Sequence, residues 1–210
     1  MFKKKSAFTI LEIVVAIFII SIVTAISIPI IINDTKEATY ISNWKKQFDE
    51  TKYVFNLMKI NDSQELEAAV MDGNPELIIY RYLLYMGVPL STLVPADDYT
   101  LRGLDNKIID KDSPYHIQYI AKKDSKTLVG FTLDKTCPDG EIVCGKIFFD
   151  INGEKGPNKL GVDVFGMEIH NLNLQVFGEN QEIKKIKKDC SRFGSGAYCS
   201  IYYLRNGRFY

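Results

Sequence analysis

The chain has 210 residues, of which 26 are basic, 26 are acidic, 46% are hydrophobic and 12% are aromatic. This is the composition of an ordinary globular protein with enough apolar material for one packed domain, and it excludes disordered, collagen-like and low-complexity chains. Because the formal net charge is zero, the chain as a whole does not attract nucleic acid, which is therefore not a default partner.

The first predicted element is an apolar helix close to the N-terminus. Residues 8–32 contain one charged side chain, Glu12, and are long enough to cross about 30 Å of hydrocarbon as a helix. Three lysines at positions 3–5 predict that the N-terminus stays in the cytoplasm and that the rest of the chain is exported. The alternative is a cleaved secretory signal peptide, but this run exceeds the usual apolar region of about 7 to 15 residues.

Glu12 has no basic residue within the same span. A carboxylate inside hydrocarbon costs about 2.5 to 3.5 kcal/mol, so we expect a partner at the lipid interface, on a neighbouring chain or created by processing. Cleavage after Ala7 would create such a partner, because the new α-amino group of Phe8 is cationic at neutral pH. A contact between that amine and Glu12 of a staggered neighbour would neutralise both charges.

Residues 3–16, with the sequence KKKSAFTILEIVVA, resemble the N-terminus of type IV pilins and type II secretion pseudopilins. That family has a short basic leader, a small residue at the cut, and Phe-Thr-Leu-Ile-Glu opening an apolar helix. The resemblance implies that a prepilin peptidase cleaves between Ala7 and Phe8 and methylates the Phe8 amine. It also implies that Glu12 guides subunit addition by meeting that amine on a neighbour. Ala7 stands where glycine is usual, and Pro29 falls where the family often has a helix-bending proline.

The helix is predicted to continue beyond the membrane to about Ile60. Its second half has an apolar stripe at three- and four-residue steps, formed by Ile41, Trp44, Phe48, Phe55 and Met58. Pro29 removes one backbone donor and predicts a bend. We therefore expect a cleaved leader over residues 1–7, a transmembrane or filament-core half-helix over 8–32, an amphipathic half-helix over 33–60 and a globular domain over 61–210.

The globular domain is predicted to contain further helices followed by strands. Asp62 and Glu65 match a capping box that opens a short helix through Met71, and a second helix, buried against a sheet, is expected from Pro75 to about Met86. Strands are expected over residues 116–120, 127–133, 146–151, 168–176 and 200–204. The predicted fold is α+β, with the long N-terminal helix packed on an antiparallel sheet, and the resemblance implies a pilin-like arrangement.

The four cysteines agree with export to an oxidising compartment. Cys137 and Cys144 bracket a Pro-Asp-Gly turn, and Cys190 and Cys199 bracket a glycine-containing loop, so local pairing would give two disulfides. Three pairings are formally open, and a zinc site is a further alternative whose usual ligand spacing is shorter. The C-terminal pair also resembles the bridge that closes a C-terminal loop in many pilins.

A polar loop follows the third expected strand. Oxygen-bearing side chains alternate with glycines at Asp150, Asn152, Glu154, Asn158 and Asp163. Such a loop could converge the six or more oxygens that Ca²⁺ prefers, although its spacing is not that of an EF-hand. Some pseudopilins bind calcium beside their sheet, which supports a calcium site by analogy. The alternative is a pair of turns whose polar groups only satisfy the backbone.

The sequence contains no pattern typical of an enzyme. His116 and His170 lie in strand-like runs without a recognisable nucleophile beside them. A basic cluster is formed by Lys184, Lys185, Lys187, Lys188 and Arg192. Because acidic residues surround this cluster, we expect a solvated strand or turn there rather than a binding site for DNA.

These observations predict a structural subunit that is processed and then polymerises with other pilin-like subunits. Its expected partners are prepilin peptidase, an inner-membrane assembly platform and the membrane before assembly. It would begin as a single-pass inner-membrane protein, with its C-terminal domain outside the cytoplasm, and end in a periplasmic or cell-surface filament. The alternative function is a monomeric, membrane-anchored periplasmic binding domain.

Overall fold

The computed structural model describes residues 9–71, 76–133, 144–170, 173–205 and 207. The chain divides into two compact units, Met1–Thr39 and Tyr40–Tyr210. One helix, α1 (Ile10–Met71), contributes to both units. The amphipathic half of the helix is therefore largely part of the second unit, whose boundary lies well before the predicted start of the globular domain at residue 61.

The first unit consists of the apolar part of α1. Its large side chains are exposed, with Ile10 at 82% and Ile26 at 63%. Among the described residues, α1 is the one helix whose length and composition would allow it to cross a membrane. The Ser21 hydroxyl donates to the Ile17 carbonyl, which satisfies a polar group in this apolar stretch. The helix continues through Pro29, and the bend expected there stays a prediction.

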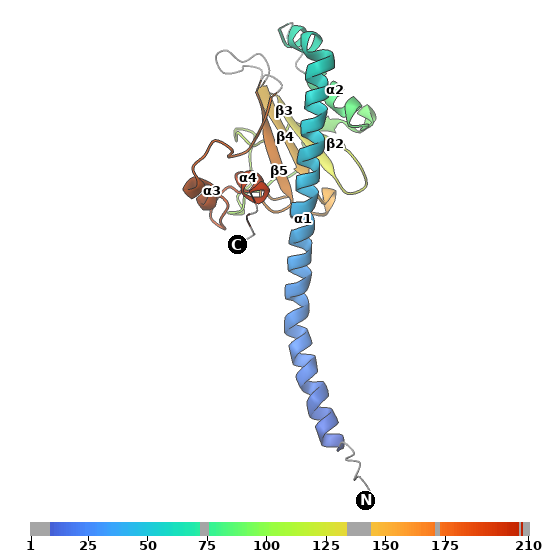
Figure 1. Ribbon diagram of the computed structural model, residues 1–210, viewed down its shortest axis with the longest axis vertical. Coiled ribbons are helices and arrows are strands. Elements are labelled where there is room, and N and C mark those ends of the chain that lie inside the picture. Colours follow the sequence, from blue (N-terminus) through green and yellow to red (C-terminus); the bar gives the residue numbers. More distant parts are fainter. Residues whose placement is uncertain (1–8, 72–75, 134–143, 171–172, 206, 208–210) are drawn as a thin grey trace, which may run out of the picture. The chain divides into compact units, whose positions relative to one another are not determined.

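The second unit contains an antiparallel sheet whose strands follow one another in chain order (Figure 1). Its strands are β1 (Val94–Pro95), β2 (Tyr119–Lys122), β3 (Leu128–Leu133), β4 (Cys144–Asp150), β5 (Val164–His170) and β6 (Asn173–Val176). All neighbouring strands pair antiparallel, so short connections suffice and no crossover is needed.

The two faces of the sheet contribute to different hydrophobic clusters. Along β4, Ile147 and Phe149 belong to the cluster that contains Trp44 of α1, whereas Phe148 packs with Phe177 in a second cluster. This alternation follows from the two-residue period of a strand. Both faces are therefore covered, and β3 is buried along its whole length because of this. The predicted α+β fold, with the long helix on an antiparallel sheet, is confirmed.

Trp44 connects α1 to the sheet. Its side chain is fully buried, and its ring stacks on Phe165 of β5 at a centroid distance of 5.4 Å. The indole Nε1 donates to the carbonyl of Ser200 at 2.9 Å. A buried indole requires such an acceptor, so this bond fixes the helix against the C-terminal segment.

The remaining helices are short. They are α2 (Glu76–Tyr85), α3 (Ile183–Asp189) and α4 (Cys199–Leu204), with 3₁₀ turns at η1 (Leu90–Thr92) and η2 (Gly153–Lys155). The helix α2 buries one face, which carries Tyr82 and Leu83, while Leu84 is 61% exposed. The Tyr82 ring packs on Phe131 of β3 at a centroid distance of 5.7 Å, so the predicted burial against the sheet holds for one face of the helix. The basic cluster, expected in a strand or turn, lies on α3 and in the residues just after it.

The helix α1 does not end near Ile60, and no separate helix opens at Asp62. The run from there to Met71 contains no glycine or proline, so nothing in the sequence interrupts the helix. The Glu65 carboxylate accepts hydrogen bonds from Arg81 of α2 at 2.6 and 2.7 Å instead of capping a new helix. The Glu65 side chain therefore connects α1 to α2 and does not cap a helix.

One strand prediction was wrong, and another covered parts of two strands. The run 168–176 forms the end of β5 and all of β6, which pair antiparallel with His170 opposite Asn173. Residues 200–204 belong to α4 rather than to a strand. Helix formation there buries Ile201 and Tyr203 against the rest of the unit, so packing overrides their β propensity.

We predict that Phe165→Ala destabilises the second unit by about 3–5 kcal/mol, because it removes a fully buried ring in contact with Trp44 and Tyr203. Urea unfolding of the full chain in detergent, followed by circular dichroism and by the fluorescence of the single tryptophan, measures this change. The matched control is Phe193→Ala, whose ring is 79% exposed and whose loss should change stability by less than about 0.5 kcal/mol. Equal midpoints for the two variants would contradict the packing described above.

Candidate functional site

The start of α1 holds Glu12 through a reciprocal pair of hydrogen bonds with Thr9. The backbone N–H and the hydroxyl of Thr9 both donate to Glu12 Oε2 at 2.8 Å. The N–H of Glu12 in turn donates to the Thr9 hydroxyl at 3.3 Å. This is a capping box, which satisfies backbone donors that the first turn of a helix leaves unpaired. The sequence analysis proposed the lipid interface, a neighbouring chain or the Phe8 amine as the partner of Glu12 and missed Thr9. The T-x-x-E spacing was the signal for this contact.

The capping box orients the Glu12 carboxylate without neutralising it. All donors from Thr9 reach the same oxygen, Oε2, and each of them is uncharged. The negative charge therefore remains available to a cation from another molecule. Ala7 and Phe8, the predicted cleavage and methylation residues, lie outside the described residues.

The polar loop brings together two of the predicted calcium ligands as buried carboxylates. Asp150 is 3% exposed, and its Oδ2 accepts a hydrogen bond from the Tyr99 hydroxyl at 2.7 Å. Asp163 is fully buried and accepts from the N–H groups of Asn158 and Lys159 at 3.0 and 2.7 Å. These bonds organise the backbone of the loop, as the turn interpretation predicts.

The buried charges of this loop are not balanced by a nearby cation in the described part of the chain. Burial raises the pKa of Asp150 to about 7, and the neighbouring Asp163 charge adds to the rise. Burial also raises the pKa of Asp163 above its ordinary value. The side-chain oxygens of Asn152 and Asn158 are buried and lack a hydrogen-bond partner. Unpaired buried acceptors are costly, so a water molecule or a bound cation beside these oxygens would stabilise the loop.

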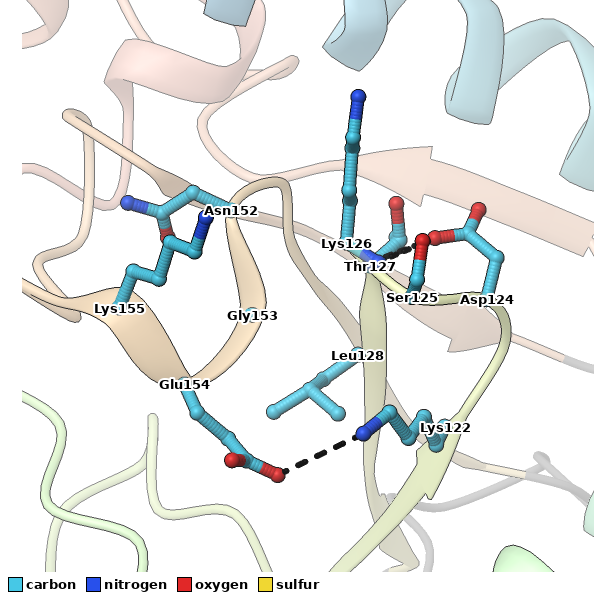
Figure 2. Close-up of a pocket in the computed structure, with 10 residues that line it drawn as sticks. All are labelled: Lys122, Asp124, Ser125, Lys126, Thr127, Leu128, Asn152, Gly153, Glu154 and Lys155. Carbon is cyan, nitrogen blue, oxygen red and sulfur yellow. Dashed lines mark hydrogen bonds and ion pairs between the residues drawn. The ribbon is translucent and has the colours of Figure 1, made fainter.

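Glu154 does not join these residues. Its side chain is 80% exposed and lies 3.9 Å from the Lys122 ammonium group, as Figure 2 shows. In the described ranges there is no group of three or more His, Cys, Asp or Glu side chains that could hold a metal ion. Any cation bound here would therefore depend on the two aspartates together with amide or backbone oxygens and water.

The loop packs directly on the C-terminal disulfide. Gly161 has a φ of +78°, and a Cβ there would lie 2.5 Å from Cys199 Sγ. The hydroxyl of Tyr203 donates to the Gly161 carbonyl at 3.1 Å. Only glycine allows both this backbone conformation and this approach. The position of the loop thus depends on the C-terminal segment.

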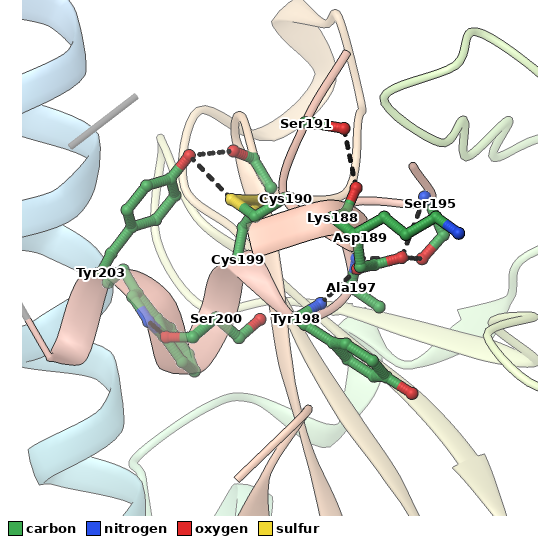
Figure 3. Close-up of a disulfide and its surroundings, with 12 residues drawn as sticks. Lys188, Asp189, Cys190, Ser191, Ser195, Ala197, Tyr198, Cys199, Ser200 and Tyr203 are labelled. Carbon is green, nitrogen blue, oxygen red and sulfur yellow. Dashed lines mark hydrogen bonds between the residues drawn. A yellow bond between two sulfur atoms is a disulfide. The ribbon is translucent and has the colours of Figure 1, made fainter. Parts of the chain in front are cut away.

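The disulfide joins Cys190 to Cys199, which confirms the local pairing predicted for the C-terminal cysteines. It connects the end of α3 to the start of α4, and the loop between them is held by the Asp189 carboxylate (Figure 3). This carboxylate accepts from Ser195 N and Oγ at 3.0 and 2.6 Å and from Tyr198 N at 2.8 Å. Of the other predicted pair, Cys144 begins β4, whereas Cys137 lies outside the described residues, so this pairing stays a prediction.

Comparison with protein families supports the role of the N-terminal segment. A family model of the prokaryotic N-terminal methylation motif matches residues 2–28. This motif is the leader signature of type IV pilins and pseudopilins, so the resemblance inferred from residues 3–16 is confirmed. The motif indicates a substrate of prepilin peptidase, implies a structural subunit and, with the apolar helix, fits membrane anchoring. Comparisons with curated proteins and with solved structures found no match.

We predict that replacing both Cys190 and Cys199 by alanine lowers the free energy of unfolding by about 2.5 kcal/mol, because the unfolded chain then loses the constraint of the closed loop. Urea unfolding of the full chain without added reductant, which keeps the wild-type disulfide intact, measures the loss. The corresponding double serine variant should lose at least as much, since both positions are buried and would enclose hydroxyl groups. If the alanine variant unfolds within about 0.5 kcal/mol of the wild type, the bridge does not stabilise the domain.

Proposed function

Given the leader signature over residues 2–28, we propose that this protein is a structural subunit that polymerises through residues 8–32 into a type IV pilus or a type II secretion pseudopilus. In this proposal, prepilin peptidase cleaves between Ala7 and Phe8 and methylates the Phe8 amine. An inner-membrane assembly platform then moves the mature chain from the bilayer into the filament. The observation that carries the proposal is a charged Glu12 inside the apolar segment matched by the motif.

The physical support comes from the first unit and its charge. Its apolar side chains are exposed along the helix, so they require lipid or other copies of the same segment around them. Among packed copies, the Glu12 carboxylate would be buried, and it would then need an opposite charge within hydrogen-bond distance. A methylated Phe8 amine on the next subunit supplies that charge. Because this contact is head-to-tail, repeating it generates an open fibre.

We predict that Glu12→Leu and Glu12→Gln both abolish incorporation into filaments, because each removes the negative charge. Glutamine can keep the capping box with Thr9, whereas leucine cannot, so the pair separates charge from helix capping. The measurement is the amount of subunit in sheared filaments relative to the membrane fraction of the native cells. We expect both variants to accumulate in the membrane.

Mass spectrometry of the N-terminus is the control for this experiment. Each variant should still begin at Phe8, because a chain that retains Met1 would have failed at cleavage rather than at assembly. Normal incorporation of Glu12→Gln into filaments would show that helix capping is sufficient for assembly and that the negative charge of Glu12 is not required. If the wild type and both variants remain monomeric in the membrane and are absent from filaments, the alternative is favoured, namely a monomeric membrane-anchored binding domain.

We further propose that the polar loop binds one Ca²⁺ ion through Asp150, Asp163 and the side-chain oxygens of Asn152 and Asn158. The unpaired asparagine oxygens beside two buried carboxylates support this, since Ca²⁺ prefers such hard oxygen ligands. The ion would neutralise the carboxylates and hold the loop against the sheet. Glu154 is left out because its exposed side chain faces Lys122.

We predict that Ca²⁺ at a hundredfold excess over its Kd stabilises the full chain by about 2.7 kcal/mol relative to EGTA. Thermal unfolding in detergent should show a rise in Tm of roughly 5–10 °C. Asp163→Asn and Asp150→Asn should each remove this increment, because they replace an anionic ligand by a neutral one. Glu154→Gln is the matched control from the same loop and should keep it. A Tm that is identical in Ca²⁺ and EGTA for the wild type would rule the site out.

A further inference from the structure

The short helix α3 presents a basic face to solvent. Of its seven residues, Ile186 is fully buried, and the four lysines around it are exposed. We define the basic face by the side chains of Lys184, Lys185, Lys187, Lys188 and Arg192. The helix packs on the rest of the unit through Ile186, and its lysines therefore remain at the surface.

Three acidic residues, Glu179, Glu182 and Asp189, lie near the basic face in the sequence, and they leave an excess of positive charge because the face has five cations. Asp189 is turned toward the inside of its own loop, where Ser195 and Tyr198 donate to its carboxylate (Figure 3). Glu179 accepts from the N–H of Val176 at 3.0 Å. Of the ion pairs found between described residues, none involves the five cations of the basic face. The positive charge is therefore concentrated on one side of α3.

Exposed apolar groups accompany these cations. Phe193 is 79% exposed, and the Arg192 guanidinium lies 4.8 Å from the centre of its ring. Beside the ring is a hollow of about 400 Å³ that is also lined by Lys185, Lys188 and Tyr198. Ile183, at the start of α3, is 52% exposed. Lysines surrounding an exposed aromatic ring are the combination that binds at the interface of an anionic bilayer.

We propose that the basic face docks the second unit onto an anionic lipid surface, with the Phe193 ring inserted among the headgroups and the lysines at the lipid phosphates. The chain carries its own apolar, membrane-length segment, so a lipid surface is present at high local concentration. Each basic residue near such a surface strengthens binding roughly fivefold, so a few suffice. This goes beyond filament formation, since it concerns the subunit while it is still in the membrane.

A nucleic acid is the less favoured occupant of the same surface. Loss of residues 1–7 removes three lysines, which leaves 23 basic and 26 acidic side chains and a side-chain charge of −3. A soluble polyanion would therefore approach a molecule with no overall attraction for it. The lipid contact needs no such approach, because the tether already holds the domain near the bilayer.

The test uses the full chain with Phe193→Trp, reconstituted in vesicles of neutral phosphatidylcholine or of phosphatidylcholine with 30% phosphatidylglycerol. Lipids brominated on the acyl chain quench an indole that enters the interface. The native Trp44 is fully buried and provides the unquenched internal reference. We expect at least twofold stronger quenching of the introduced indole in the anionic vesicles, and loss of that difference in 0.5 M NaCl. Both leaflets carry the same lipids, so the orientation of insertion does not affect the result.

Two matched charge variants complete the experiment. Replacing lysines 184, 185, 187 and 188 by glutamine in the Phe193→Trp background should reduce quenching to the level of neutral vesicles. The control replaces four exposed lysines elsewhere, at positions 107, 111, 126 and 155, and should leave quenching unchanged. Equal quenching in both lipids, or an equal loss in both charge variants, would overturn the proposal. Displacement of the indole by a single-stranded oligonucleotide, with the same lysine dependence, would assign the face to nucleic acid instead.

Discussion

One charged carboxylate determines in which surroundings the apolar N-terminal segment of this protein is stable. Glu12 is oriented by Thr9 through a capping box, so its position at the start of α1 does not depend on a partner. Its charge, however, is not cancelled by that contact. The segment is therefore stable at an interface, where water solvates the carboxylate, and in a packed bundle only if a cation meets it. This requirement distinguishes an assembling segment from a plain membrane anchor.

The second unit is held together around Trp44, which connects three parts of the chain that are far apart in sequence. Its ring packs on Phe165 of the sheet, and its N–H bonds the carbonyl of Ser200 in α4. The disulfide at the start of α4 then meets the polar loop at Gly161. Helix, sheet, disulfide and loop thus form one continuous set of contacts. Substitutions in neighbouring members of this set should therefore have non-additive effects on the free energy of unfolding.

The hydrogen bonds of the polar loop agree with the turn interpretation, and calcium binding there is our proposal. Asp150 and Asp163 accept backbone hydrogen bonds, as side chains in turns do. Yet their burial, the raised pKa of Asp150 and the unpaired oxygens of two asparagines leave a negative site that turns alone do not require. The same carboxylates that bond the backbone would, in the proposal made above, also bind the cation.

The amino-acid sequence was enough to place the N-terminal apolar helix, its charged residue and the processing motif, and to predict an antiparallel sheet and local pairing of the C-terminal cysteines. These are local properties, because hydropathy, period and loop length can be judged within a short window. Three other features could not be inferred in this way: residues 200–204 are helical, Glu154 faces Lys122, and Phe193 is exposed beside the lysines of α3. Each of these depends on which distant residues occupy the neighbouring space, and short segments with weak intrinsic preference adopt whatever conformation buries their apolar side chains best.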